Sequence, residues 1–255
     1  MANGLRNEKT ETLGVSLDEV NLAQMNLKGV AKNTPFDFNE NLSRQFDANV
    51  YLKREDLQVV RSYKLRGAYN KIVQLSEQEK NNGVICASAG NHAQGVAYSC
   101  QQLNIKGKIV MPTTTPQQKI KQVKWFGKDQ IEIILHGDTF DDASAFAHQL
   151  SQEGNITFIH PFDDEKVIAG QGTVALEILN QCNQPIDYIF VPIGGGGLAS
   201  GVISVMKTLS PNTKIIGVEP TGAASMAEAI KQKQSFALAK IDPFVDGAAV
   251  KKAGE

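Results

Sequence analysis

Short apolar strands alternate with amphipathic helices along most of this chain, and this alternation restricts the possible folds more than any other feature. Strands and helices in this order build parallel sheets with helices on both faces. The expected strands are Asn49–Lys53, Gly83–Ala87, Gly107–Met111, Gln130–Leu135, Ile156–Ile159, Tyr188–Ile193 and Lys214–Glu219. The expected helices include Leu65–Lys80, Ala93–Leu103, Pro116–Phe126, Phe140–Glu153 and Leu198–Leu209. We therefore predict an α/β fold with a mainly parallel sheet.

The beginning of the chain predicts one further helix. Residues 1–15 are a polar leader, and Ser16 then stands before Asp18 and Glu19. A serine cap followed by acidic residues suits the positive end of a helix dipole. Pro35 disfavours helical geometry at Thr34, so this helix ends at or before that point.

Charge and cysteine content exclude several classes of protein. The 255 residues carry 26 Lys and Arg against 27 Asp and Glu, so no basic excess favours nucleic acid or an anionic membrane. The leader has no apolar segment typical of a signal peptide, and no apolar run approaches the ~18 residues of a membrane span. The three cysteines form no CxxC pair. We expect free thiols in a cytoplasmic protein without nucleic-acid or membrane partners.

Four consecutive glycines, Gly194, Gly195, Gly196 and Gly197, separate the apolar strand ending at Ile193 from the helix beginning near Leu198. Glycines there expose backbone N–H groups at the positive end of a helix, which predicts an anion site, most often for phosphate. The segment lacks the Gly-Lys-Ser/Thr ending of a nucleoside-triphosphate loop.

A nicotinamide dinucleotide is the competing interpretation of this loop. Gly194, Gly196 and Ala199 fit the looser GxGxxA pattern, and Glu219 ends the following strand where a ribose-binding acid is expected. The glycine loop alone leaves this alternative open.

A second strand-to-helix junction carries small and polar residues: Ser88, Ala89, Gly90, Asn91 and His92. Such a junction can bind a carboxylate or phosphate through backbone N–H groups. The simpler alternative is that Ser88 or Asn91 only caps the helix. The four histidines, at positions 92, 136, 148 and 160, lack ligand spacing, so no metal site is predicted.

Lys64 lies at the start of a predicted helix, where the dipole disfavours a cation. A lysine whose charged form is disfavoured has a lowered pKa and a nucleophilic amine, which suits Schiff-base chemistry. The alternative is an ordinary surface lysine. Taken together, a phosphate site, a carboxylate site and an imine-forming lysine indicate a pyridoxal-phosphate enzyme acting on an amino acid, whereas a nicotinamide enzyme explains only the first.

The segments YLKREDLQ, SYKLRGAYN, SAGNHAQGVA, HPFDDEKVIAGQGT, VPIGGGGLASG, IIGVEP and DGAAV closely resemble the threonine dehydratases (threonine ammonia-lyases), in the same order and spacing. The resemblance runs from about residue 16 to the end and is closer to the biosynthetic, isoleucine-pathway branch. It implies the tryptophan-synthase-β fold: two domains, each a mainly parallel twisted sheet flanked by helices, with the cofactor in the cleft between them. The larger, cofactor-binding domain would comprise residues 1–79 and 159–255, and the smaller one residues 80–158.

The resemblance also implies a role for each candidate residue. Lys64 would bind pyridoxal 5'-phosphate covalently and carry the proton of the substrate's α-carbon. Asn91 would bind the cofactor's phenolic oxygen, and Gly194 to Leu198 its phosphate. The loop from Ser88 to His92 would bind the substrate carboxylate. Water would leave L-threonine or L-serine, giving 2-oxobutanoate or pyruvate and ammonia.

Serine racemase, a related family, places a second serine where this chain has Ala89, and an acid where this chain has Ser225. A missing hydroxyl removes the proton donor on the opposite face, which favours elimination over racemisation. A related racemase or lyase remains an alternative to the dehydratase.

The resemblance further implies that the catalytic domain continues past the DGAAV segment and is followed by a domain sensing isoleucine. This sequence ends at Glu255. We therefore expect a truncated enzyme that exposes apolar sheet surface, lacks direct isoleucine feedback and has reduced activity, or an inactive remnant. If it assembles, we expect a homo-oligomer, a dimer or tetramer.

Overall fold

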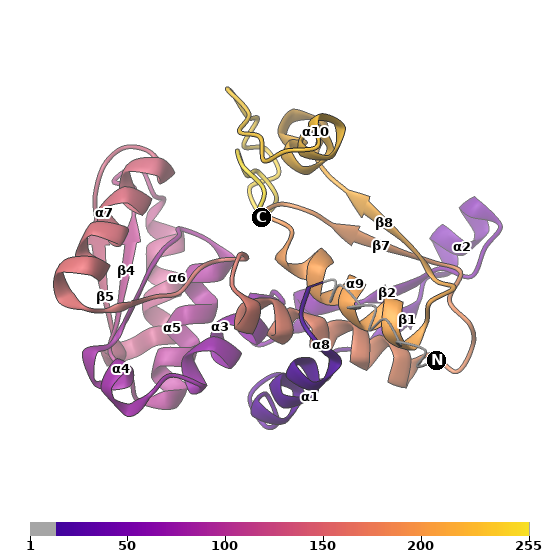
Figure 1. Cartoon of the computed structure of the whole chain (residues 1–255), viewed down its shortest axis with the longest axis horizontal. Coiled ribbons are helices and arrows are strands. Elements are labelled where there is room, and N and C mark those ends of the chain that lie inside the picture. Colours follow the sequence, from indigo (N-terminus) through magenta and orange to yellow (C-terminus); the bar gives the residue numbers. More distant parts are fainter. Residues whose placement is uncertain (1–13, 255) are drawn as a thin grey trace, which may run out of the picture.

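Parallel strand pairs make up the two sheets nearest the candidate residues, which confirms the predicted α/β class (Figure 1). The computed structural model describes residues 14–254, so most of the polar leader lies outside the described part. Within residues 14–254, no helix combines the length and apolar character needed to cross a membrane.

The first sheet has four parallel strands in the order β5-β4-β3-β6. Their bounds are Val84–Ala87 (β3), Gly107–Met111 (β4), Ile131–Leu135 (β5) and Thr157–Phe158 (β6). Alternate residues of β3 face opposite ways, as strand geometry requires. Val84 and Cys86 join an apolar cluster with α5 (Asn91–Leu103) and α6 (Gln117–Gly127), while Ile85 and Ala87 join one with α7 (Phe140–Gly154). Both faces are covered, as predicted.

The second sheet contains two parallel strands, β7 (Tyr188–Pro192) and β8 (Lys214–Val218). One face packs through Val191 on α9 (Gly197–Leu209) and α8 (Glu165–Gln181). On the other face Phe190 is 67% exposed and Val218 49% exposed. For this sheet the prediction of two covered faces is wrong within the described residues, and the expected exposure of apolar sheet surface is confirmed.

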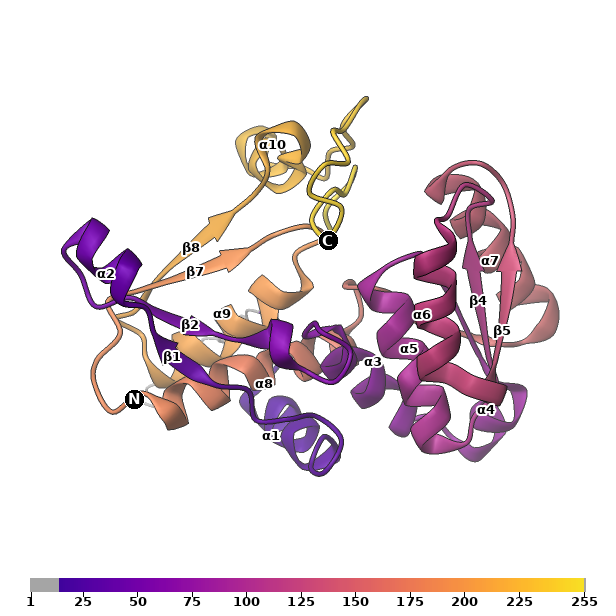
Figure 2. The same ribbon diagram turned by 180° about the vertical axis from the view of Figure 1, so that it is seen from behind.

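Four helices connect the two sheets in a continuous row of contacts, α5 to α3 (Lys64–Val73), α3 to α8, and α8 to α9 (Figures 1 and 2). The N-terminal helix α1 (Leu17–Asn26) packs against α8 and begins with the predicted Ser16 cap, which forms a capping box with Glu19. The remaining elements are β1 (Phe36–Phe38), α2 (Glu40–Phe46), β2 (Tyr51–Lys53), α4 (Glu77–Asn82), α10 (Ser225–Gln232) and the 3₁₀ turns η1 (Glu55–Leu57), η2 (Lys128–Gln130) and η3 (Thr221–Ala223).

The single helix predicted over Leu65–Lys80 is wrong, because the structure contains two helices there. α3 ends at Val73, and Ser76 begins α4 by forming a second capping box with Glu79. A capping box starts a new helix because it satisfies the free N–H groups of a first turn. The strand predicted over Asn49–Lys53 forms as β2, but it pairs antiparallel with β1.

Candidate active site

Lys64 is the first residue of α3, as predicted, and its amine faces aromatic and carbonyl groups. Its Nζ donates a hydrogen bond to the Pro161 carbonyl oxygen at 2.6 Å and lies 5.5 Å and 6.0 Å from the ring centroids of Tyr63 and Phe162. Burial among these groups lowers the pKa of Lys64 to about 8. The predicted low pKa is therefore present, but desolvation is its cause rather than the helix dipole.

The second candidate loop ends at α5, which begins at Asn91. Gly90 is the N-cap residue, and no side chain caps this helix. Ser88 Oγ instead accepts a hydrogen bond from the Gly90 N–H at 3.2 Å. The alternative that Ser88 or Asn91 only caps the helix is therefore wrong.

His92 is buried in the first turn of α5. Its Nε2 donates to the Ile159 carbonyl oxygen at 2.8 Å, since a carbonyl can only accept. Burial lowers the pKa of His92 to about 3, so the ring is neutral. Nδ1 is then an acceptor that is buried and has no partner in the structure.

The glycine loop joins β7 to α9, and two of its glycines are required by the approach of Phe162. A Cβ at Gly195 would lie 2.2 Å from the Phe162 ring, and one at Gly197 would lie 2.5 Å from the Phe162 carbonyl oxygen. Gly196 has φ +98°, in the left-handed region that favours glycine. Any larger side chain here would displace the loop from Phe162.

The three helices that begin at candidate residues share one electrostatic feature. α3, α5 and α9 have no side-chain cap and no acidic residue in the first turn. By contrast, α1, α4 and α7 begin with capping boxes supplied by Ser16, Ser76 and Thr139. An uncapped helix start leaves N–H donors and the positive dipole end available to an anion.

Two short segments bring these helix starts together. Phe162 contacts the glycine loop and faces Lys64. A Cβ at Gly247 would lie 3.8 Å from Asn91 Nδ2, and one at Gly194 would lie 3.2 Å from the Ala248 Cα. The sequence prediction named neither Phe162 nor Ala248 as a site residue, although both lie in the quoted segments HPFDDEKVIAGQGT and DGAAV.

Glu219, the acid invoked for a dinucleotide ribose, has a different role. Its carboxylate oxygens accept hydrogen bonds from the backbone N–H groups of Met226 and Ala227, both at 2.8 Å. It therefore caps α10, which removes the main support for the nicotinamide alternative. Among the described residues, no group of three or more His, Cys, Asp or Glu side chains is arranged to hold a metal ion.

A family model described as "Pyridoxal-phosphate dependent enzyme" matches residues 27–255 of the chain. The chain belongs to this pyridoxal-phosphate-dependent enzyme family. The match covers every candidate residue and confirms the cofactor class predicted from the three loops.

Known members of the family resemble the chain over most of its length. It is 57% identical over 241 residues to the biosynthetic L-threonine dehydratase IlvA of Halalkalibacterium halodurans, covering 94% of this chain but 58% of that enzyme. The processed threonine deaminase isoform 2 of Solanum lycopersicum is 47% identical, with a TM-score of 0.87 over 96% of this chain and 72% of its own. Maize serine racemase is 31% identical, with a TM-score of 0.89 over 94% and 72% respectively.

The residues present fit pyridoxal phosphate. The family's cofactor needs an amine for its aldehyde and a cradle for its phosphate. Lys64 supplies an amine with a pKa of about 8. The start of α9 supplies an uncapped first turn whose glycines leave no room for a Cβ beside Phe162.

Proposed function

We propose that this chain carries the catalytic site of a pyridoxal-phosphate-dependent threonine dehydratase. It would remove water from L-threonine or L-serine and release ammonia with 2-oxobutanoate or pyruvate, the first step of isoleucine biosynthesis. This proposal depends on one observation: the Lys64 amine has a lowered pKa and faces Phe162, and Phe162 in turn contacts the glycine loop. The names of the bacterial and plant relatives support the same substrate class.

Each residue has a proposed task. When bound, pyridoxal phosphate supplies a ring that accepts electron density from the substrate's α-carbon. Lys64 Nζ binds the cofactor, and the same amine, when free and neutral, takes the α-proton. The N–H groups of Gly194 to Leu198 bind phosphate, and Asn91 Nδ2 donates to the cofactor's phenolic oxygen. The N–H groups of the loop from Ser88 to His92 hold the substrate carboxylate.

A visible absorption titration tests this assignment. Adding pyridoxal phosphate to the purified chain should produce a protein-bound absorption band that shifts on addition of L-threonine. The Lys64→Ala variant should give no such band because it has no amine at this position, while its circular dichroism should match that of the parent. A band of equal strength in the variant would overturn the assignment of Lys64, and a coupled keto-acid assay then measures turnover.

Racemisation is the second candidate activity, because serine racemase structures align as well as the plant deaminase does. Ala89 distinguishes the two: it offers no hydroxyl to return a proton from the opposite face. We therefore favour elimination.

Location and assembly belong to the same proposal. The free thiols of Cys86, Cys100 and Cys182 suit a reducing compartment, the cytoplasm. The exposed apolar face of the β7–β8 sheet supports a homo-oligomer, a dimer or tetramer. Light scattering of the purified chain measures its oligomeric state.

A further inference from the structure

A buried cluster of charged side chains holds the first turn of α3, two residues from Lys64. The Arg66 side chain is 1% exposed and lies between two carboxylates. Its Nε and Nη2 donate to Glu55 at 2.9 Å and 2.8 Å, and its Nη1 and Nη2 donate to Glu177 at 2.6 Å and 2.9 Å. Two bidentate pairs on one guanidinium fix its plane and its position.

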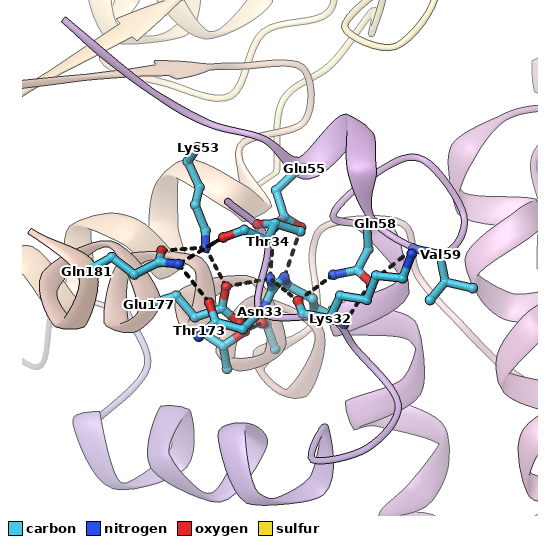
Figure 3. Close-up of polar contacts among 12 residues, drawn as sticks. Lys32, Asn33, Thr34, Lys53, Glu55, Gln58, Val59, Thr173, Glu177 and Gln181 are labelled. Carbon is cyan, nitrogen blue, oxygen red and sulfur yellow. Dashed lines mark hydrogen bonds and ion pairs between the residues drawn. The ribbon is translucent and has the colours of Figure 1, made fainter. Parts of the chain in front are cut away.

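Lys53 completes this cluster through Glu177, the carboxylate that it shares with Arg66 (Figure 3). Its Nζ donates to Glu177 Oε2 at 2.6 Å, to the Thr34 carbonyl oxygen at 2.8 Å and to Gln181 Oε1 at 2.9 Å. Two cations therefore face two anions, with their hydrogen bonds satisfied. Such a cluster is tolerated in the interior only when its charges are paired, so each partner is held in place.

The backbone around Arg66 is equally confined. A Cβ at Gly170 of α8 would lie 2.5 Å from the Arg66 carbonyl oxygen, and one at Gly95 of α5 would lie 3.0 Å from the Lys64 carbonyl oxygen. The first turn of α3 is thus packed closely between α5 and α8. The Arg66 side chain also links this turn to η1 through Glu55 and to α8 through Glu177. No side chain caps α3, so these packing and ion-pair contacts, rather than a cap, fix the position of its first turn.

We propose that Arg66 is a positioning residue for Lys64: its two-sided hold on Glu55 and Glu177 keeps the first turn of α3 in register, so that Lys64 Nζ stays against the Pro161 carbonyl. Lys64 itself has no ion pair among the described residues. Glu55 and Glu177 neutralise the charge of Arg66 within the cluster. The pKa of the Lys64 amine, two residues earlier, is therefore set by desolvation. This inference rests on the proposed role of Lys64.

The pKa of Lys64 is the property that reports this positioning. If the first turn shifts, water reaches Nζ and the pKa rises from about 8 toward the ordinary value of 10.5. The titratable groups facing Lys64 from neighbouring elements are His92 and His160, and Tyr63 precedes it. Burial lowers the pKa of both histidines and raises that of Tyr63 to about 12. None of them titrates between about pH 7 and 10, so a titration in this range belongs to Lys64.

Two charge-preserving substitutions separate positioning from general stability. Arg66→Lys keeps the charge but loses the planar fork that binds two carboxylates. Lys53→Arg keeps the charge and disturbs the same cluster, including Glu177, without touching α3. The reactivity of Lys64 toward limiting acetic anhydride, followed by peptide mass spectrometry across this pH range in the cofactor-free chain, gives its pKa in each variant.

We expect Arg66→Lys to raise the pKa of Lys64 by about one unit or more, and Lys53→Arg to leave it within about 0.3 unit, at comparable loss of thermal stability. Equal shifts in both variants, or no shift in Arg66→Lys, would overturn the proposal. If Arg66→Lys does not fold, the Glu55→Asp variant can be used instead. It shortens one of the two carboxylate side chains that bind Arg66, at a position outside α3, and it should also raise the pKa of Lys64. No shift in that variant would also count against the proposal.

These measurements use neither cofactor nor substrate. A chain that fails to turn over threonine would therefore refute the proposed function while leaving the pKa comparison intact. Conversely, normal turnover with an unchanged Lys64 pKa in Arg66→Lys would refute the positioning role alone.

Discussion

Lys64 and His92 show how burial of single residues sets the chemistry available in this site. With a pKa of about 8, about one Lys64 amine in ten is neutral at pH 7, against about one in 3,000 for a lysine at 10.5. His92 is held neutral with Nδ1 free to accept. The proposed base is therefore available near neutral pH without a neighbouring carboxylate.

Ala89 is the residue at which we expect the type of reaction to be decided. The Ala89→Ser variant should convert L-serine to D-serine, raising the ratio of racemisation to elimination by about tenfold or more, because the new hydroxyl can donate a proton from the opposite face. Chiral chromatography of recovered serine measures this ratio. Ala89→Gly, which changes the side chain without adding a hydroxyl, is the matched control. Recovered serine that remains entirely L in the Ala89→Ser variant would contradict this account.

At the scale of elements, the helices meet through glycine. Gly170 of α8 lies so close to α3 that a Cβ would be 2.5 Å from the Arg66 carbonyl oxygen and 2.7 Å from the Gly67 Cα. Backbone atoms cannot move aside as a flexible side chain can. The contact between α3 and α8 thus depends on the absence of a side chain.

The Gly170→Ala substitution should lower the free energy of unfolding by about 1–3 kcal/mol, since a methyl group forced into a close backbone contact causes overpacking. Urea denaturation followed by circular dichroism measures the change. Gly247→Ala is the control, because its Cβ would meet only an ordinary contact at 3.8 Å. Equal stability of the two variants would show that the helix contact can relax.

For the whole molecule, the last described residues connect the helices on the four-stranded sheet with the glycine loop that follows β7. Asp246 pairs with Lys119 of α6, and Lys251 pairs with Asp141 at the start of α7. Gly254 N–H donates to the Gly195 carbonyl oxygen at 3.0 Å. The segment therefore contacts the helices of the four-stranded sheet and the glycine loop at once.

The two ion pairs of this segment are exposed, so we expect them to add little to global stability. Removing both, in an Asp246→Asn, Lys251→Gln variant, should change the free energy of unfolding by less than about 1 kcal/mol in urea at low salt. The parent chain in about 0.5 M sodium chloride should behave like the variant, because salt screens exposed charges. A loss of unfolding free energy well above this bound would mean that the two ion pairs hold the C-terminal segment and the helices on the four-stranded sheet together.

Much of the local structure could be predicted from the sequence. The strand β4 forms over the predicted residues, and Lys64, Asn91 and the glycine loop stand at helix starts, because short-range patterns of apolar residues and glycine set these features. The Ser76–Glu79 capping box that separates α3 from α4 was also visible in the sequence, but the prediction overlooked it. The division into domains at residues 80 and 158, and the role of each site residue, stay predictions.

The sequence by itself determined the α/β class, the family and the positions of the helix starts that carry the candidate residues, since each depends on residues close together in the chain. Only the tertiary structure decided that Phe162 faces both Lys64 and the glycine loop, and that Arg66 is held by Glu55 and Glu177. These contacts join residues as much as 111 positions apart, and no local pattern specifies them. The low pKa of Lys64 belongs to the same group, because desolvation depends on which distant segments exclude water from the amine.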